Sequence, residues 1–232
     1  MEIHKPHAAK NWREFAVEIG TIVVGILIAL GLEQVIEAIH DRTIADEARE
    51  AVRAEVGENL WWVDQREQDG PCITRRLAEI DAILTRAEQG QAFPIVRHVG
   101  TPPAVKLTDL RWEANAQAGR ASLFTGDEQR FFDNMYFTTT NFAKYADLEE
   151  TSWIKLQALQ RRDRLTPATT ERLRDAWVQA SYYNQRLQVI VDRAQPWASA
   201  LHLTPNNPGD FDTKTMDPAL NELCQPIDGS GS

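Results

Sequence analysis

Residues 15–39 read FAVEIGTIVVGILIALGLEQVIEAI and form the most apolar stretch of the chain. Residues 20–32 carry no charge, and the polar positions of the whole stretch are Glu18, Thr21, Glu33, Gln34 and Glu37. A helix that crosses a hydrocarbon core of about 30 Å needs roughly 20 residues at about 1.5 Å per residue. The stretch therefore predicts a transmembrane helix over residues 15–39.

The flanks of this stretch predict its orientation. Lys5, Lys10 and Arg13 precede it, as is typical of a cytoplasmic N-terminal tail, here residues 1–14. Two alternatives stay open. Ala29-Leu30-Gly31 has the small residues of a signal-peptide cleavage site, and an apolar run with acidic flanks also fits a buried helix of a soluble bundle. We prefer the membrane anchor.

Composition limits what the remaining residues can do. With 43% hydrophobic residues among 232, the chain can bury a core, which argues against wholesale disorder. It has 34 acidic against 25 basic residues and a net charge of −9. This balance argues against a protein that binds nucleic acid through phosphate contacts, so no nucleic-acid partner is expected.

The residues after the anchor have the periodicity of helices. Apolar residues at spacings of three and four predict one helix over residues 41–69 and a second that follows Gly70-Pro71 and stops at Gly90. The Pro- and Gly-containing residues 91–106 predict a loop, with residues 95–99 as a short extended piece.

Two long helices are expected after a short one over residues 109–119. Thr125 and Glu128 have the spacing of a capping box and open the first, which closes at residues 161–164. Thr166-Pro167 opens the second, and Pro196 is expected to kink or end it. The two should pack as an antiparallel hairpin.

The predicted fold class is therefore all-α, because the strands of an α/β enzyme are missing. We expect one N-terminal transmembrane helix plus an extracytoplasmic bundle of four or five helices over residues 40–203. Residues 204–228 are expected to form an irregular C-terminal tail. The final Gly-Ser-Gly-Ser, residues 229–232, resembles an added flexible linker.

The sequence has two cysteines, Cys72 and Cys224. Neither has a second Cys or a His at metal-ligand spacing, so zinc is not expected. If the body lies outside the cytoplasm, a disulfide that ties the C-terminal tail to the start of the second helix can persist. The alternative is two unpaired buried thiols.

Motifs that would indicate catalysis are missing from the sequence. It has no Gly-rich phosphate loop, no His-Glu-x-x-His, no Cys-x-x-Cys and no nucleophile elbow. The five histidines are scattered. We predict that the chain is not an enzyme, and we assign no catalytic, cofactor-binding or metal-binding residues.

The anchor carries the most informative pattern. Thr21, Gly25 and Ala29 repeat every four residues and form a small-residue stripe through which membrane helices pack closely; lipid contact is the alternative. Glu18 precedes Gly25 by seven positions and shares its face. An intramembrane carboxyl either serves a partner or a proton path, or reaches the cytoplasmic interface.

Aromatic residues mark the body. Trp61 and Trp62 are adjacent and point about 100° apart on a helix, so core packing and partner contact are both open for them. The helix that begins after Thr125 carries aromatic residues on more than one face, as expected of a central helix or one that bears an interface.

The string EIGTIVVGILIALGLEQ, from Glu18 to Gln34, resembles the opening of a family of uncharacterised single-pass inner-membrane proteins of Gram-negative bacteria. The likeness covers about the first 60 residues. Where such proteins often have Asn-Trp after the span, this chain has Glu33-Gln34. The resemblance implies an inner-membrane anchor, a cytoplasmic N-terminus and a periplasmic main domain. It implies no catalytic residues.

Two functional hypotheses follow. The first is a non-enzymatic accessory or assembly subunit that sits in the lipid bilayer and binds a membrane protein complex, or a second copy of itself, through its anchor and its helical bundle. The second is a periplasmic ligand-binding or sensing bundle, in which a pocket between the long helices binds a small molecule and signals through a partner.

Overall fold

The structure is a computed structural model and describes residues 12–209 and 222–230. It contains α1 (Trp12–Gln68), α2 (Gly70–Glu88), α3 (Leu110–Gln117), α4 (Gly126–Leu156) and α5 (Pro167–Ala200), with short 3₁₀ turns η1 (Arg120–Leu123) and η2 (Gln157–Leu159). No strand occurs in these two ranges. The predicted all-α fold class is confirmed.

The chain divides into two compact units, Met1–Ala48 and Arg49–Ser232. Within the part described, the first unit is helix only, and the second contains the rest of α1 and all later helices. Most of the expected N-terminal tail, residues 1–11, and part of the expected C-terminal tail, residues 210–221, lie outside the described residues.

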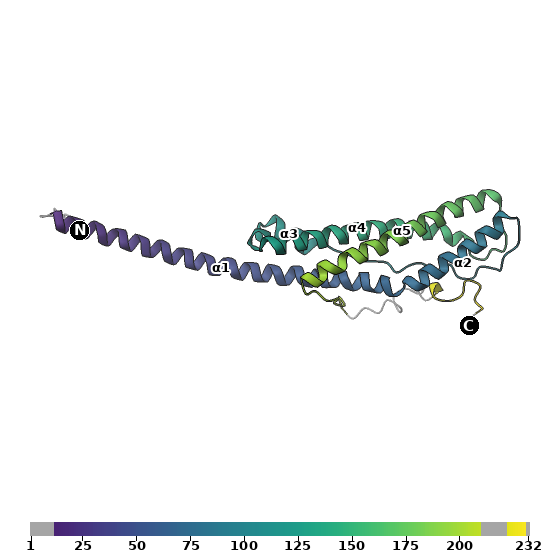
Figure 1. Cartoon of the computed structure of the whole chain (residues 1–232), viewed down its shortest axis with the longest axis horizontal. Helices are drawn as coiled ribbons and strands as arrows, with labels where there is room; N and C mark the ends of the chain where they lie inside the picture. Colours follow the sequence, from purple (N-terminus) through teal and green to yellow (C-terminus); the bar gives the residue numbers. More distant parts are fainter. Residues whose placement is uncertain (1–11, 210–221, 231–232) are drawn as a thin grey trace, which may run out of the picture. The chain divides into compact units, whose positions relative to one another are not determined.

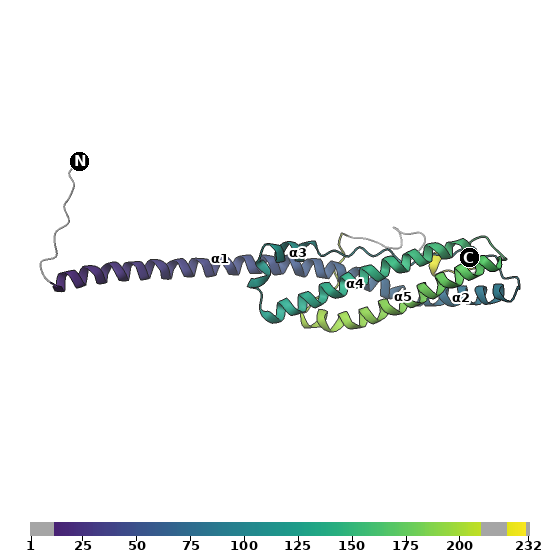
Figure 2. The same cartoon turned by 90° about the horizontal axis from the view of Figure 1, so that it is seen from above.

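Helices α4 and α5 form the expected antiparallel hairpin, and they lie side by side in both views (Figures 1 and 2). Two ring contacts join them, Phe131 with Trp197 at 5.6 Å and Tyr145 with Tyr183 at 6.1 Å between centroids. Helix α2 packs against α5 in the same unit.

The start of α4 follows the predicted capping box. Thr125 accepts a hydrogen bond from the backbone N–H of Glu128 at 3.2 Å, and the Glu128 carboxylate accepts one from the backbone N–H of Thr125 at 3.0 Å. Two backbone donors that a helix start leaves unpaired are thereby satisfied. Thr166 caps α5 with one such bond, because its hydroxyl accepts from the backbone N–H of Thr169 at 3.3 Å.

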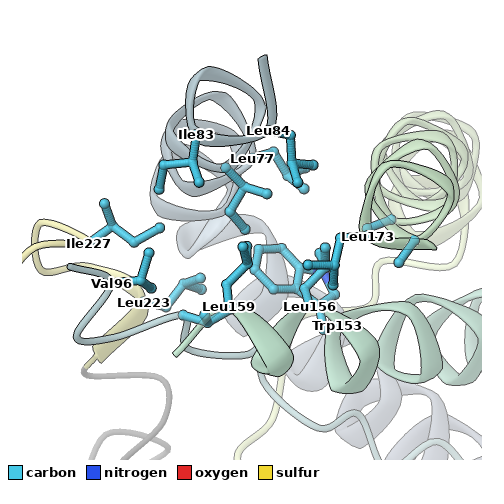
Figure 3. Packing of buried hydrophobic residues seen from close by; sticks show 14 of the residues in the cluster. Leu77, Ile83, Leu84, Val96, Trp153, Leu156, Leu159, Leu173, Leu223 and Ile227 are labelled. Atoms are coloured by element: carbon cyan, nitrogen blue, oxygen red, sulfur yellow. The ribbon is translucent and has the colours of Figure 1, made fainter. Parts of the chain in front are cut away.

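A single apolar cluster packs together the end of the bundle at which α4 and α5 are joined. It joins side chains of α2, α4, α5, the loop after α2 and the segment 222–230 (Figure 3). Trp153 is at its centre and fully buried. Apolar spacing places five α2 residues on one face. Four of them are buried here, namely Ile73, Leu77, Ile80 and Leu84, and the fifth, Ala87, is half-buried.

Three details differ from the sequence-based expectations. Helix α2 resumes at Gly70, directly after the single turn residue Asp69, because Pro71 occupies a first-turn position where a missing N–H costs nothing. Helix α4 gives way to η2 at Gln157, earlier than residues 161–164. Pro196 does not end α5, which continues to Ala200.

The loop after α2 contains neither helix nor strand and is fixed by main-chain hydrogen bonds. The N–H of Arg161 donates to the carbonyl of Val96 at 2.7 Å, and that of Arg97 donates to the carbonyl of Ile227 at 2.8 Å. Residues from three separate stretches of the chain therefore satisfy one another's backbone groups at this end of the bundle.

Candidate functional site

The first unit contributes one exposed apolar helix surface. Within the described part of the chain, α1 is the one helix that is long and apolar enough to span a membrane. No residue of its most apolar window is buried, and Leu27 and Ile36, for example, are 62% and 67% exposed. An apolar surface of this extent is not stable in water and needs a cover of lipid or protein.

The structure places Thr21, Gly25 and Ala29 together on one face of α1. Successive members of this stripe are about 6 Å apart along the axis and drift by about 40° around it. A Cβ built on Gly25 would meet no atom within 4 Å, so the stripe is open to an incoming helix. Thr21 Oγ1 donates to the carbonyl of Val17 at 2.8 Å, which satisfies the hydroxyl inside the helix.

Glu18 lies on the same face, about 10 Å along the axis from Gly25. Its side chain is exposed and makes no ion pair with any of the described residues. Near the start of the helix, Trp12 and Phe15 have their ring centroids 6.1 Å apart, at the level where an aromatic belt is expected. This face of α1 therefore carries the Glu18 carboxyl near its N-terminal end, followed by the small side chains of Thr21, Gly25 and Ala29.

The tryptophan pair divides between core and surface. Trp62 is buried, Trp61 is half-buried, and their rings meet edge to face at 4.8 Å. Core packing therefore accounts for Trp62, and only Trp61 presents surface to a partner. On α4, by contrast, Phe137 is 72% exposed and is the strongest apolar feature on the outside of that helix.

Cys72 and Cys224 form a disulfide, with Cα atoms 4.9 Å apart. Beside it lies Arg76, fully buried, a residue that sequence analysis did not single out. Its guanidinium donates to five carbonyl oxygens, those of His98, Val99, Glu222, Leu223 and Gln225. Burial lowers the pKa of Arg76 and its ion pair with Glu79 opposes this. Together these contacts fix the C-terminal segment to α2.

A second unanticipated group is a buried ion pair that crosses the bundle. Arg66 Nη2 lies 2.8 and 3.0 Å from the two carboxylate oxygens of Glu149 and 2.9 Å from Asn184 Oδ1. A single guanidinium nitrogen of Arg66 therefore donates to both carboxylate oxygens of Glu149. This arrangement is weaker than two parallel hydrogen bonds and compensates poorly for the hydration that both charged groups lose on burial. Burial accordingly raises the pKa of Glu149, although Arg66 and Trp153 oppose it.

A third group stabilises α3 from another helix. Buried Glu55 on α1 accepts hydrogen bonds from the backbone N–H groups of Arg111 at 2.9 Å and Trp112 at 3.1 Å, and from the Tyr136 hydroxyl at 2.6 Å. It caps α3, whose own N-cap residue, Asp109, makes no side-chain capping hydrogen bond. Burial, and then Glu55, raises the pKa of Tyr136. These contacts account for the burial of the Glu55 carboxylate and give it a structural role.

The described residues contain no group of three or more His, Cys, Asp or Glu side chains placed to hold a metal ion. Comparison with known proteins finds no family model, no curated protein and no solved structure that matches the chain. The exposed face of α1 is therefore the main feature of the chain that points to a function.

Proposed function

We propose that this chain is a non-enzymatic accessory or assembly subunit that α1 anchors in a membrane. It binds a membrane protein complex, or a second copy of itself, through the stripe of Thr21, Gly25 and Ala29, with the helical bundle adding contacts. The observation that carries the proposal is that this stripe lies open on the apolar part of α1, where no residue is buried.

The physical reason is the geometry of helix packing in lipid. Lipid tails are as apolar as leucine side chains, so helices in a bilayer associate through close packing and polar contacts rather than through apolar burial. Small residues let two backbones approach. A carboxyl on the same face, as at Glu18, then gains most by pairing with a cation or hydrogen-bond donor of the partner.

The proposed location is a bacterial inner membrane, with residues 1–14 in the cytoplasm and the bundle in the periplasm. The Cys72–Cys224 disulfide supports this side, because such bonds persist in oxidising compartments and are rare in the cytosol. The charge pattern before the anchor supports the same orientation.

The test compares two glycine substitutions in the full chain. Gly25→Leu fills the stripe, whereas Gly31→Leu makes the same chemical change about 120° around the helix, where a Cβ also meets nothing within 4 Å. After extraction in a mild detergent, we expect Gly25→Leu to lose the co-purifying partner or second copy and Gly31→Leu to keep it. Unchanged association in Gly25→Leu would refute the role of the stripe.

A ligand-binding or sensing bundle is the second candidate function. The observation in its favour is a surface cleft of about 520 Å³ between the long helices α4 and α5, near the turn that joins them. This candidate predicts a saturable rise in melting temperature when the ligand is added. Like the first candidate, it requires a partner protein, which here would carry the signal.

A further inference from the structure

The cleft between α4 and α5 is unusual in its charge. Three cationic side chains line it, Lys155 from α4, Arg162 from the connection and Arg172 from α5, against the single carboxylate of Asp175. The whole chain has a net charge of −9, so this excess of two positive charges runs against the rest of the molecule. A cleft lined by one sign of charge concentrates ions of the other sign.

None of the three cations is neutralised by a carboxylate of the described residues. Each hydrogen-bonds an uncharged acceptor instead. Arg162 Nε donates to a backbone carbonyl at 2.8 Å, Arg172 Nε donates to another at 3.2 Å, and Lys155 Nζ lies 3.3 Å from the Gln179 side-chain oxygen. Arg174 on the same helix differs, since it pairs with Asp81 and with Glu88 at 2.7 Å.

These bonds use only part of the donor capacity of the three side chains. Arg162 and Arg172 each use Nε to donate to the carbonyl four residues earlier on the chain, and Arg172 Nη2 also donates to Thr169 Oγ1 at 3.4 Å. Both guanidiniums keep further Nη–H donors for a ligand. Because the Gln179 oxygen accepts from Lys155, its amide NH₂ is left to donate.

We propose that this cleft binds a dianionic phosphate monoester, with Arg162 and Arg172 donating to the phosphate oxygens and Lys155 supplying charge. Guanidinium groups suit phosphate because they donate two parallel hydrogen bonds. The excess of two positive charges matches a dianion. The ester is either that of a small soluble molecule or that of a lipid headgroup, and the chemistry of recognition is the same for both.

The proposal does not depend on what α1 binds, and it gives the second candidate function a ligand class. The two can fail separately. Loss of phosphate binding would leave the Gly25→Leu result untouched, and loss of the membrane partner would leave phosphate binding untouched.

The first experiment titrates the full chain, in neutral detergent, with glycerol 3-phosphate and follows binding by calorimetry. We expect saturable binding that is at least tenfold weaker in Arg162→Gln and in Arg172→Gln. Arg193→Gln is the matched control, because Arg193 is an exposed arginine of α5 about 31 Å along the helix from Arg172. It should bind as the wild type does.

A second variant excludes misfolding as the cause of any loss. Asp175→Asn removes the one carboxylate of the cleft, so it should tighten glycerol 3-phosphate binding several-fold, a gain that a damaged fold would not produce. Weaker or unchanged binding in Asp175→Asn would overturn the proposed arrangement.

A third arm distinguishes the two sources of the ester. The chain in phosphatidylcholine nanodiscs is mixed with vesicles of phosphatidylcholine alone or with phosphatidic acid, and co-flotation is measured. Binding of the soluble ester without flotation identifies a small-molecule site, and phosphatidic-acid-dependent flotation that Arg172→Gln abolishes identifies a headgroup site. Binding to neither probe, or equal loss in Arg193→Gln, would overturn the proposal.

Discussion

The two units of this chain place the same residue types in opposite environments. In the first, Leu27 and Ile36 of α1 are more than half exposed, whereas in the second Ile73 and Leu84 of α2 have no exposed surface. Helix α2 is covered by its own chain, through α4, α5 and segment 222–230. The apolar face of α1 is covered by none of the described residues of its own unit, so its stability depends on what surrounds it.

The energetic consequence differs accordingly. Full burial of a Leu or Ile side chain is worth about 1.5–3 kcal/mol. In the second unit this free energy is gained when the chain folds. In the first unit it is gained only when lipid or another protein covers the apolar side chains. Substitutions in the first unit should therefore change location and association, and substitutions in the second should change the free energy of unfolding.

The largest effect is expected from charge in the apolar helix. Val24→Arg combined with Ile28→Arg should prevent membrane insertion, because each arginine near the centre of a span costs about 2.5–3.5 kcal/mol. Carbonate extraction of membranes checks this, with Thr43→Arg on the polar part of α1 as control. A double variant that stays in the membrane pellet would contradict the assignment of residues 15–39 as the anchor.

In the second unit, Trp153→Ala should lower the free energy of unfolding by about 3–5 kcal/mol, because it opens a cavity at the centre of the apolar cluster. Its neighbour Ile154 is 61% exposed, so Ile154→Ala should change stability by less than about 0.5 kcal/mol. Urea unfolding measures both. Equal effects of the two substitutions would break the contrast between core and surface.

Loss of the disulfide should have the next largest effect. Cys72→Ala combined with Cys224→Ala removes a link across 152 residues and should cost about 2–5 kcal/mol. Dithiothreitol should lower the melting temperature of the wild type and leave the double variant unchanged. If the reductant had no effect on the wild type, the link would not contribute to stability.

Glu149 should give a smaller, pH-dependent effect. Because burial raises its pKa in the folded chain above the ordinary value of 4.5, the folded state holds this proton to higher pH than the unfolded state does. Its contribution to stability is complete below pH 4.5 and is lost as pH rises through the folded pKa. Relative to Glu149→Gln, wild-type stability in urea should fall from pH 4 to pH 8; a relative rise would contradict this.

The smallest effect concerns the start of α4. Thr125→Ala removes the side-chain half of the capping box and should cost about 1 kcal/mol. Thr151→Ala, at an exposed position inside the same helix, should be neutral or slightly stabilising, because alanine favours helix more than threonine does. Denaturant midpoints at neutral pH compare the two. A larger loss from Thr151→Ala would be inconsistent with the role of the cap.

Local signals allowed much of this fold to be predicted. The capping box at Thr125, the Thr166-Pro167 start and the stop at Gly90 each depend on residues close together in sequence, and each lies where it was expected. Pro196 does not end α5, because one lost hydrogen bond and one local clash do not outweigh the packing of Ala194 and Ala198 around it.

The polar contacts inside the bundle could not be predicted in the same way. Glu55 caps a helix that begins 55 positions later, and Arg76 binds carbonyls near the C-terminus. Such pairings depend on tertiary proximity, which a single sequence does not reveal. The cationic cleft is a similar case, since Lys155 and Arg172 become neighbours only when the hairpin closes.

The most direct test of the central claim is the composition of the particle that this chain forms in its native membrane. The wild-type chain, tagged and extracted in mild detergent, is passed through size-exclusion chromatography, and its fractions are analysed by mass spectrometry. The account predicts a stoichiometric membrane protein, or a second copy of the chain, at the same elution volume. A chain that elutes alone as a monomer would contradict it.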